Sequence, residues 1–178
     1  MATPDFIHHL RQSVGHEMLW LPGVTAVVIK DVPPGAPIHA VPEVLLIKRA
    51  DDGQWTPVTG ICEPGEQPHH AAIREVKEET GIDVRVEALL GVGATQPIEY
   101  PNGDKCTFMD TAMRLSVIGD EVPVVNDDET TEVGWFSVMQ MPRMQPRFRL
   151  VIGDAVAQLR RPEGFKPRMG YVKRDRAR

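Results

Sequence analysis

Residues 60–82 read GICEPGEQPHHAAIREVKEETGI, and the rest of the chain is interpreted outward from this stretch. Its second half has the spacing of a helix over residues 69–80. Pro68 suits the first position of that helix, and Gly81 suits the residue just past its end. Residues 55–66, which lead into it, contain glycines and prolines and no helical period, so they predict an ordered loop.

Three glutamates share one face of this predicted helix. Glu75, Glu78 and Glu79 stand at i, i+3 and i+4, where side chains are neighbours. Three like charges repel one another, so the cluster makes most sense around a hard divalent cation, and oxygen ligands suit magnesium or manganese. Arg74 can neutralise and aim the carboxylate of Glu78, four residues further on. A glutamate run by itself is more often a solvated helix face, so the assignment depends on the surrounding residues.

The surrounding residues complete a known pattern, G-x5-E-x7-R-E-U-x-E-E-x-G-U with U apolar, which is the Nudix box. All nine specified positions are filled, by Gly60, Glu66, Arg74, Glu75, Val76, Glu78, Glu79, Gly81 and Ile82. The chain therefore resembles the Nudix hydrolase family over these 23 residues. The order of strands, loops and helices is similar to that family over roughly residues 22–160.

The resemblance implies which residues hold the metal. Glu75 and Glu79 are implied as direct ligands, and Glu78 either binds the metal too or acts in catalysis through a water. The backbone carbonyl of Thr59, just before the box glycine, is a further implied ligand. Relatives usually have glycine at that position, and threonine offers the same carbonyl.

Five further residues complete the candidate site. The resemblance implies that Glu66 and Arg74 orient the ligands, which places Arg74 in the catalytic set. Relatives often carry a general base on a later loop, and Glu129 is the candidate here; the alternative is a solvated acidic turn. Trp55 and Tyr100 are candidates for substrate binding. The alternatives are core packing for Trp55 and a simple hairpin turn at Tyr100.

The resemblance implies an α/β fold, a Nudix-type α/β/α sandwich with a mixed sheet. The implied reaction is hydrolysis of the pyrophosphate linkage of a nucleoside diphosphate derivative: a nucleotide, a nucleotide sugar or a dinucleotide. The implied cofactor is Mg2+, for which Mn2+ can substitute, and the implied partner is this small-molecule substrate. Many relatives are homodimers, and the sequence leaves the oligomeric state open.

Two other functions on the same fold are alternatives. An isomerase that resembles isopentenyl diphosphate isomerase needs a catalytic cysteine, but neither Cys62 nor Cys106 lies in a matching motif. A binding module that has lost catalysis typically has eroded glutamates, and none is eroded here. Gly91 and Gly93 are similar to part of a dinucleotide-binding loop, but the third glycine is missing.

Hydrophobic patterns on either side of the box predict the remaining elements. Pro22-Gly23 is expected to stop whatever precedes it. The expected strands span 24–29, 43–49, 84–95, 106–118 and 132–138, and the other expected helices span 4–15 and 146–160.

The length and composition of the chain indicate its domain organisation, its partners and its location. The chain has 178 residues and a net charge of -5, which fits one domain, residues 1–165, with an N-terminal helical extension over 1–21. Residues 166–178 hold six basic residues and one acid, and are expected to be a solvated tail outside the domain. The acidic body argues against a nucleic-acid partner. The absence of a long apolar run argues against a membrane partner, so the expected location is cytoplasmic.

Overall fold

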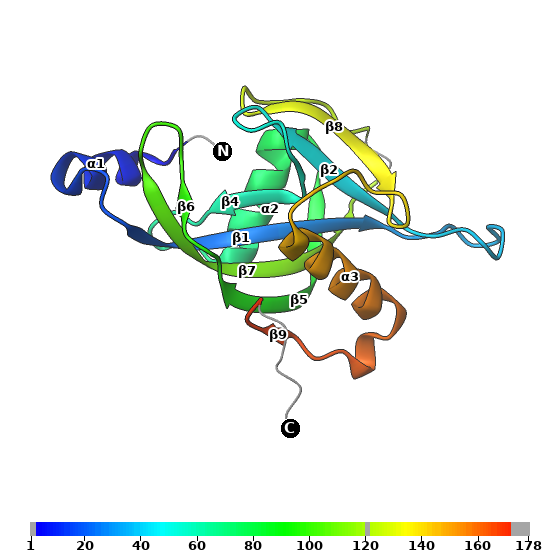
Figure 1. Ribbon diagram of the computed structural model, residues 1–178. Coiled ribbons are helices and arrows are strands. Elements are labelled where there is room, and N and C mark those ends of the chain that lie inside the picture. The colour runs from blue at the N-terminus through cyan, green and yellow to red at the C-terminus, as the bar shows by residue number, and fades with distance from the viewer. Residues whose placement is uncertain (1–2, 120–121, 172–178) are drawn as a thin grey trace.

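The computed structural model describes residues 3–119 and 122–171, which form a mixed sheet with a helix against each face (Figure 1). The strands are β1 Leu19–Lys30, β2 Glu43–Arg49, β3 Trp55–Thr56, β4 Val58–Ile61, β5 Val84–Ala94, β6 Ile98–Glu99, β7 Lys105–Val117, β8 Thr130–Ser137 and β9 Arg168–Met169. The helices are α1 Asp5–Val14, α2 Pro68–Thr80, α3 Pro146–Arg160 and the short 3-10 helix Pro162–Gly164.

The sheet order is β3-β2-β1-β7-β5-β9, and β4, β6 and β8 pair with β1, β7 and β2. The β1–β7 and β5–β9 pairs are parallel, and the other pairs are antiparallel. No helix within residues 3–119 and 122–171 is long and apolar enough to cross a bilayer.

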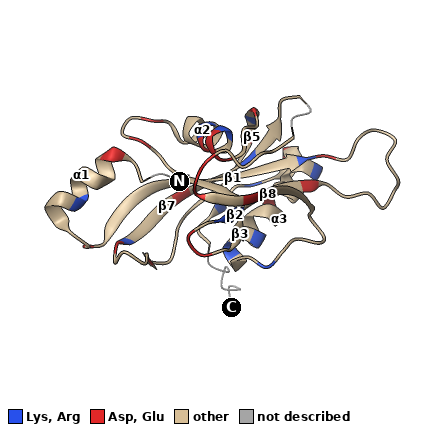
Figure 2. Ribbon diagram, turned by 90° about the horizontal axis from the view of Figure 1, so that it is seen from above, with Lys and Arg blue, Asp and Glu red and all other residues tan. Residues whose placement is uncertain are grey.

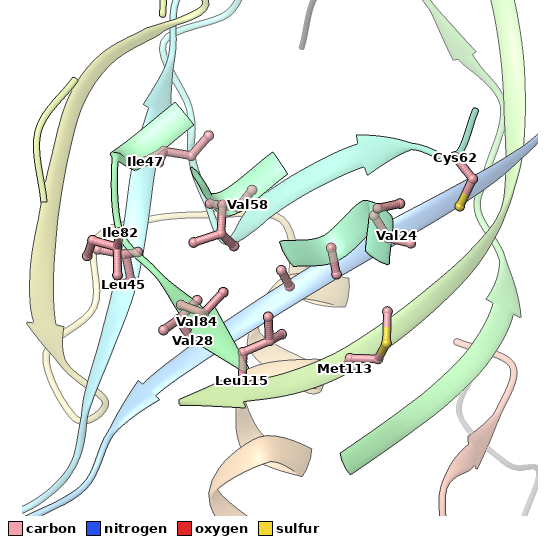
Figure 3. Close-up of a cluster of buried hydrophobic side chains, with 14 residues drawn as sticks. Val24, Val28, Leu45, Ile47, Val58, Cys62, Ile82, Val84, Met113 and Leu115 are labelled. Atoms are coloured by element: carbon pink, nitrogen blue, oxygen red, sulfur yellow. The ribbon is translucent and has the colours of Figure 1, made fainter. Parts of the chain in front are cut away.

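The side chains of β1 point alternately to the two faces of the sheet, which explains the two hydrophobic layers. Val24 and Val28 point to one face and pack with Val76 of α2 (Figure 3). Val27 and Ile29 point to the other face and pack in the layer that contains α3. Successive side chains of a strand face opposite sides of a sheet, so one apolar strand serves both layers. The predicted α/β/α sandwich with a mixed sheet is confirmed.

The prediction that Pro22-Gly23 stops the preceding segment is wrong. β1 begins at Leu19 and runs through both residues, so the last residues of the expected N-terminal extension belong to the sheet. The Pro22 carbonyl accepts a hydrogen bond from the Cys62 N–H, beyond the last β1–β4 register pair, Gly23 with Ile61. The N–H that proline lacks would face the same side, just past the last register pair of β1 and β4, so proline is tolerated at this position of the strand.

The expected loop over residues 55–66 contains two short strands. β3 pairs with β2, and β4 pairs with β1. Their shortness hid them in the sequence, because two and four residues carry too little alternation to be recognised. Of the other elements, α3 matches its predicted span, and the remaining predicted strands keep their places with shifts of a few residues at their ends.

The expected end of the domain at residue 165 also needs correction. Gly91 and Val92 of β5 pair with β9, which lies within the segment expected to be a solvated tail. Arg168 donates two hydrogen bonds, of 2.8 and 2.9 Å, to the Asp154 carboxylate on α3. The chain therefore packs on the domain as far as Tyr171, and residues 172–178 lie outside the described part.

Candidate metal and substrate site

The box glycine fits the site because a glutamate occupies the space beside it. A Cβ on Gly60 would lie 2.2 Å from Cγ of Glu75, so only glycine leaves room for that side chain. Gly60 belongs to β4, and Glu75 lies on α2 with 3% exposure. Contact between the strand and the helix therefore fixes where the Glu75 carboxylate lies.

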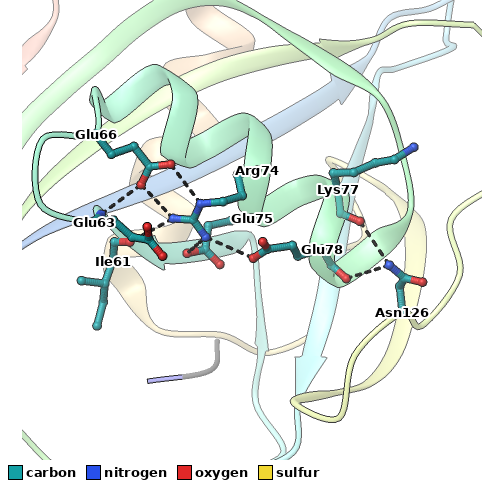
Figure 4. A network of polar contacts seen from close by, with 8 residues as sticks. All are labelled: Ile61, Glu63, Glu66, Arg74, Glu75, Lys77, Glu78 and Asn126. Carbon is teal, nitrogen blue, oxygen red and sulfur yellow. Dashed lines mark hydrogen bonds and ion pairs between the residues drawn. The ribbon is translucent and has the colours of Figure 1, made fainter. Parts of the chain in front are cut away.

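Arg74 links the box glutamates (Figure 4). Its Nε and Nη2 each donate a 2.9 Å hydrogen bond to the Glu66 carboxylate, a two-pronged contact that lowers the pKa of Glu66. Its Nη1 donates to Glu75 at 3.0 Å and to Glu78 at 3.1 Å. Nη2 also donates to the carbonyl of Ile61, so one guanidinium fixes three carboxylates and the end of β4.

Glu75 and Glu79 are acidic side chains held away from water. Glu79 is 2% exposed, and the one hydrogen bond that its carboxylate accepts from another described residue is a 3.3 Å bond from the Thr130 hydroxyl. Burial raises the pKa of Glu79 to about 8 and that of Glu75 to about 7. Glu78 differs, since its side chain is 56% exposed. Figure 2 shows acidic and basic residues together on α2.

A loop caps the end of α2 and joins it to the acidic segment before β8. The Asn126 side chain donates a 3.0 Å hydrogen bond to the Glu78 carbonyl, and its backbone N–H donates to the Glu79 carbonyl (Figure 4). These bonds satisfy carbonyl groups that a helix C-terminus leaves unpaired. They also fix the position from which the chain continues to Glu129.

A cavity of about 760 Å³ opens beside Glu79. Of the residues predicted for the site, Thr59, Glu79, Tyr100 and Glu129 line it. The other five do not line it: Trp55, Glu66, Arg74, Glu75 and Glu78.

Trp55 is partly buried and packs against the core, where its ring meets that of Phe136 edge-on at 4.8 Å between centroids. This is the packing role that the sequence left open as the alternative. Tyr100 lies at the start of the turn between β6 and β7 and lines the cavity, so its position satisfies both alternatives.

The donor set fits a hard cation, although its carboxylates are held apart. Within residues 3–119 and 122–171, no three His, Cys, Asp or Glu side chains converge in the way that holds a metal. Arg74 draws Glu75 and Glu78 toward itself. Buried Glu79 forms no ion pair with another described residue, and seven further carboxylates line the same cavity, so the wall favours a cation.

Sequence reasoning missed a second polar cluster in this cavity. Asp110 of β7 is 3% exposed and accepts hydrogen bonds from the Thr25 hydroxyl at 2.8 Å and the Tyr171 hydroxyl at 2.6 Å. Arg147 of α3 lies 3.6 Å from it, and both residues line the cavity. The one available signal was a single acid, Asp110, in the middle of the expected strand over residues 106–118.

A family model described as the NUDIX domain matches residues 24–158. An ADP-ribose pyrophosphatase of Methanocaldococcus jannaschii is 32% identical over 115 residues, which cover 63% of this chain and 64% of that protein. The NAD-capped RNA hydrolase NudC of Deinococcus radiodurans is 34% identical over 123 residues, 66% of this chain and 41% of that protein. The chain thus spans less than two thirds of the length of either relative.

A solved structure described as a UDP-X diphosphatase has the same fold. It superposes with a TM-score of 0.61, covers 96% of this chain and 76% of that chain, and is 16% identical. At that identity the likeness concerns the fold alone. The family model, in contrast, covers well over half of the chain and includes the complete box, so the protein belongs to the NUDIX domain family.

Proposed function

We propose that this protein is a metal-dependent pyrophosphohydrolase that cleaves the diphosphate linkage of a nucleoside diphosphate derivative. The observation that carries the proposal is Glu79: a buried carboxylate on the box helix, at the wall of a cavity of about 760 Å³. The cavity is large enough for a nucleotide. Eight carboxylates line this wall, and a cation bound beside Glu79 would neutralise the repulsion between that carboxylate and an anionic diphosphate.

The proposed roles follow from position. Glu75 and Glu79, with the carbonyl of Thr59, would hold the ion, for which we propose magnesium with manganese as a substitute. Such an ion neutralises phosphate oxygens and lowers the pKa of a bound water. Arg74 holds Glu75 and Glu78 in place through their hydrogen bonds.

Glu129 is the proposed general base. It lines the same cavity as Glu79, on the loop that the cap of α2 positions. In the proposed reaction a water attacks one phosphorus, its proton passes to the Glu129 carboxylate, and the bond from that phosphorus to the bridging oxygen breaks. A Glu129→Gln variant should lose about a hundredfold or more in turnover while keeping its substrate affinity. Turnover close to wild type would exclude this role.

The isomerase and binding-module alternatives receive no support. Cys106 lines the cavity, but burial raises the pKa of both cysteine thiols, which disfavours the thiolate that a catalytic cysteine needs. The box glutamates that a binding module would lose are all present.

A phosphate-release screen tests the proposal. ADP-ribose, nucleotide sugars, dinucleotides and nucleoside triphosphates would each be incubated with Mg2+, with Mn2+ and with excess chelator. Hydrolysis that needs the metal supports the proposal, and hydrolysis undiminished in chelator would refute the mechanism. Sedimentation velocity of the same sample tests the homodimer implied by the family resemblance.

A further inference from the structure

A half-buried arginine at the cavity has unused hydrogen-bond donors. Arg147 lies in the first turn of α3, lines the cavity, and has a side chain that is 23% exposed. Its guanidinium lies 4.0 Å from the centre of the Phe148 ring and 3.6 Å from the Asp110 carboxylate. Within residues 3–119 and 122–171 it donates no hydrogen bond, although a guanidinium carries five N–H groups.

The two other arginines of the cavity wall differ in this respect. Arg49 donates from Nε and Nη2 to the two carboxylate oxygens of Asp51. Arg11 donates from Nη1 and Nη2 to the backbone carbonyls of Gly15, Glu17 and Lys105, and its Nε, which donates no hydrogen bond among the described residues, lies 3.2 Å from the Asp104 carboxylate. Both arginines therefore donate hydrogen bonds to the protein itself, whereas Arg147, whose charge pairs with Asp110 at 3.6 Å, donates none to a described residue and keeps its N–H groups available to a ligand.

Asp110 fixes Arg147 without using its donors. The Asp110 carboxylate accepts hydrogen bonds at 2.8 and 3.0 Å from the Thr25 hydroxyl and at 2.6 Å from the Tyr171 hydroxyl. A carboxylate held by two hydroxyls has little freedom, and its charge lies beside the guanidinium. The Asp110 cluster therefore holds the positively charged Arg147 guanidinium in place at the cavity wall.

The wall of the same cavity offers two further donors. Gln145, Arg147 and Phe148 line the cavity, so the N-terminus of the 15-residue helix α3 opens onto it. The first turn has no acidic residue, and the N-cap residue Gln145 forms no side-chain cap. Thr56 also lines the cavity with 3% exposure, and its hydroxyl has no hydrogen-bond partner among the described residues. A buried hydroxyl without a protein partner is satisfied by a bound water, ion or ligand group.

We propose that the guanidinium and the backbone N–H of Arg147, with the Thr56 hydroxyl, form a subsite that binds a phosphate group of the substrate without the help of a metal ion. A planar, doubly donating guanidinium at a helix N-terminus is well suited to a phosphate. That the ligand is a substrate phosphate rests on the proposed function. The subsite lies on β3 and α3, apart from the metal-binding helix.

The C-terminal segment then takes part in substrate binding. Tyr171 acts as a positioning residue, because its hydroxyl fixes the Asp110 carboxylate and Asp110 in turn fixes Arg147. The segment can come this close because β5 has glycines opposite it: a Cβ on Gly93 would lie 2.8 Å from the Gly170 Cα and 2.9 Å from the Tyr171 ring.

Calorimetric titration with inorganic pyrophosphate in excess chelator tests the subsite directly. Without metal, the glutamate cluster repels the anion, so binding reports on the other donors. Arg147→Ala should weaken binding about tenfold or more, as expected for a charge-assisted contact. The matched control Arg149→Ala removes an arginine from the same helix that bonds to the carbonyls of Met141 and Pro142, and it should bind like wild type. No binding by wild type, or equal binding by Arg147→Ala, would overturn the proposal.

Two further measurements cover the positioning role and the source of the phosphate. Tyr171→Phe removes a single hydroxyl and should weaken binding several-fold alone but not in an Arg147→Ala background. Equal losses of affinity in both backgrounds would exclude the positioning role.

ADP titrated in chelator should lose affinity for Arg147→Ala by the same factor as pyrophosphate does. A loss confined to pyrophosphate would contradict a nucleotide ligand. No turnover is needed, so these results stand apart from the activity screen, and unchanged melting temperatures confirm folding.

Discussion

The side chain of Glu75 occupies the space that a Cβ on Gly60 would need, with only 2.2 Å between that position and Glu75 Cγ. The glycine and the glutamate are fifteen positions apart in the sequence and lie on β4 and α2. The pair explains why the box begins with a residue that carries no side chain: the strand must come close enough to the helix to fix a carboxylate.

Gly60→Ala should therefore lower turnover by about a hundredfold, because a displacement of about 1 Å at a catalytic group has an effect of that size. Gly153→Ala is the matched control. Gly153 lies on α3 with no atom within 4 Å of its Cβ position, so alanine should stabilise the protein by about 0.5–1 kcal/mol. Steady-state kinetics and urea unfolding of both variants check this, and a fully active Gly60→Ala enzyme would contradict it.

Glu79→Gln and Glu75→Gln should each reduce turnover by about a hundredfold or more, since each removes a charge that would face the metal. Both variants should remain folded, because both carboxylates are buried and neutral amides are less costly there. The checks are metal-dependent hydrolysis and thermal melting. Folded variants with nearly wild-type rates would show that these residues are not ligands.

The metal-free protein should lose stability as the pH rises from about 5 to 8. Burial raises the pKa of Glu79 from 4.5 to about 8 and that of Glu75 to about 7, so the folded state holds protons that the unfolded state has already released. The resulting stabilisation is complete below about pH 4.5. It disappears as the pH rises through the pKa values of the two groups in the folded state.

Urea unfolding in chelator at several pH values measures this trend. Glu79→Gln removes one of the two titrating groups, so its free energy of unfolding should fall less steeply with pH. Added Mg2+ should restore stability more at pH 8 than at pH 5, because it binds the ionised carboxylates. Parallel wild-type and Glu79→Gln curves would refute the assignment.

Truncation after Phe165 should lower the melting temperature by several degrees. It removes β9, the paired contact of Arg168 with Asp154 and the bond from Tyr171 to Asp110. A loss of about 1–2 kcal/mol in the free energy of unfolding lowers the melting temperature of a domain of this size by several degrees. Truncation after Tyr171 is the control, since it keeps all of these contacts and should leave stability unchanged. Equal melting temperatures for the two truncations would restore the interpretation of residues 166–178 as a tail outside the domain.

The sequence by itself determined the family, the box helix and the sandwich. Glu75, Glu78 and Glu79 share a helix, so their relation follows from the helical repeat, and the apolar runs of β1 and β2 are strong local signals. Local periodicity and fixed spacing need no knowledge of distant contacts.

Only the tertiary structure decided how the cavity wall is assembled. Thr25, Asp110 and Tyr171 meet from three segments far apart in the sequence, and Arg147 joins them from a fourth. No spacing rule links such residues, because the sheet order brings them together. The same holds for Gly91 and Gly93, which show no helix or turn signal and take their meaning from the C-terminal segment that packs against them.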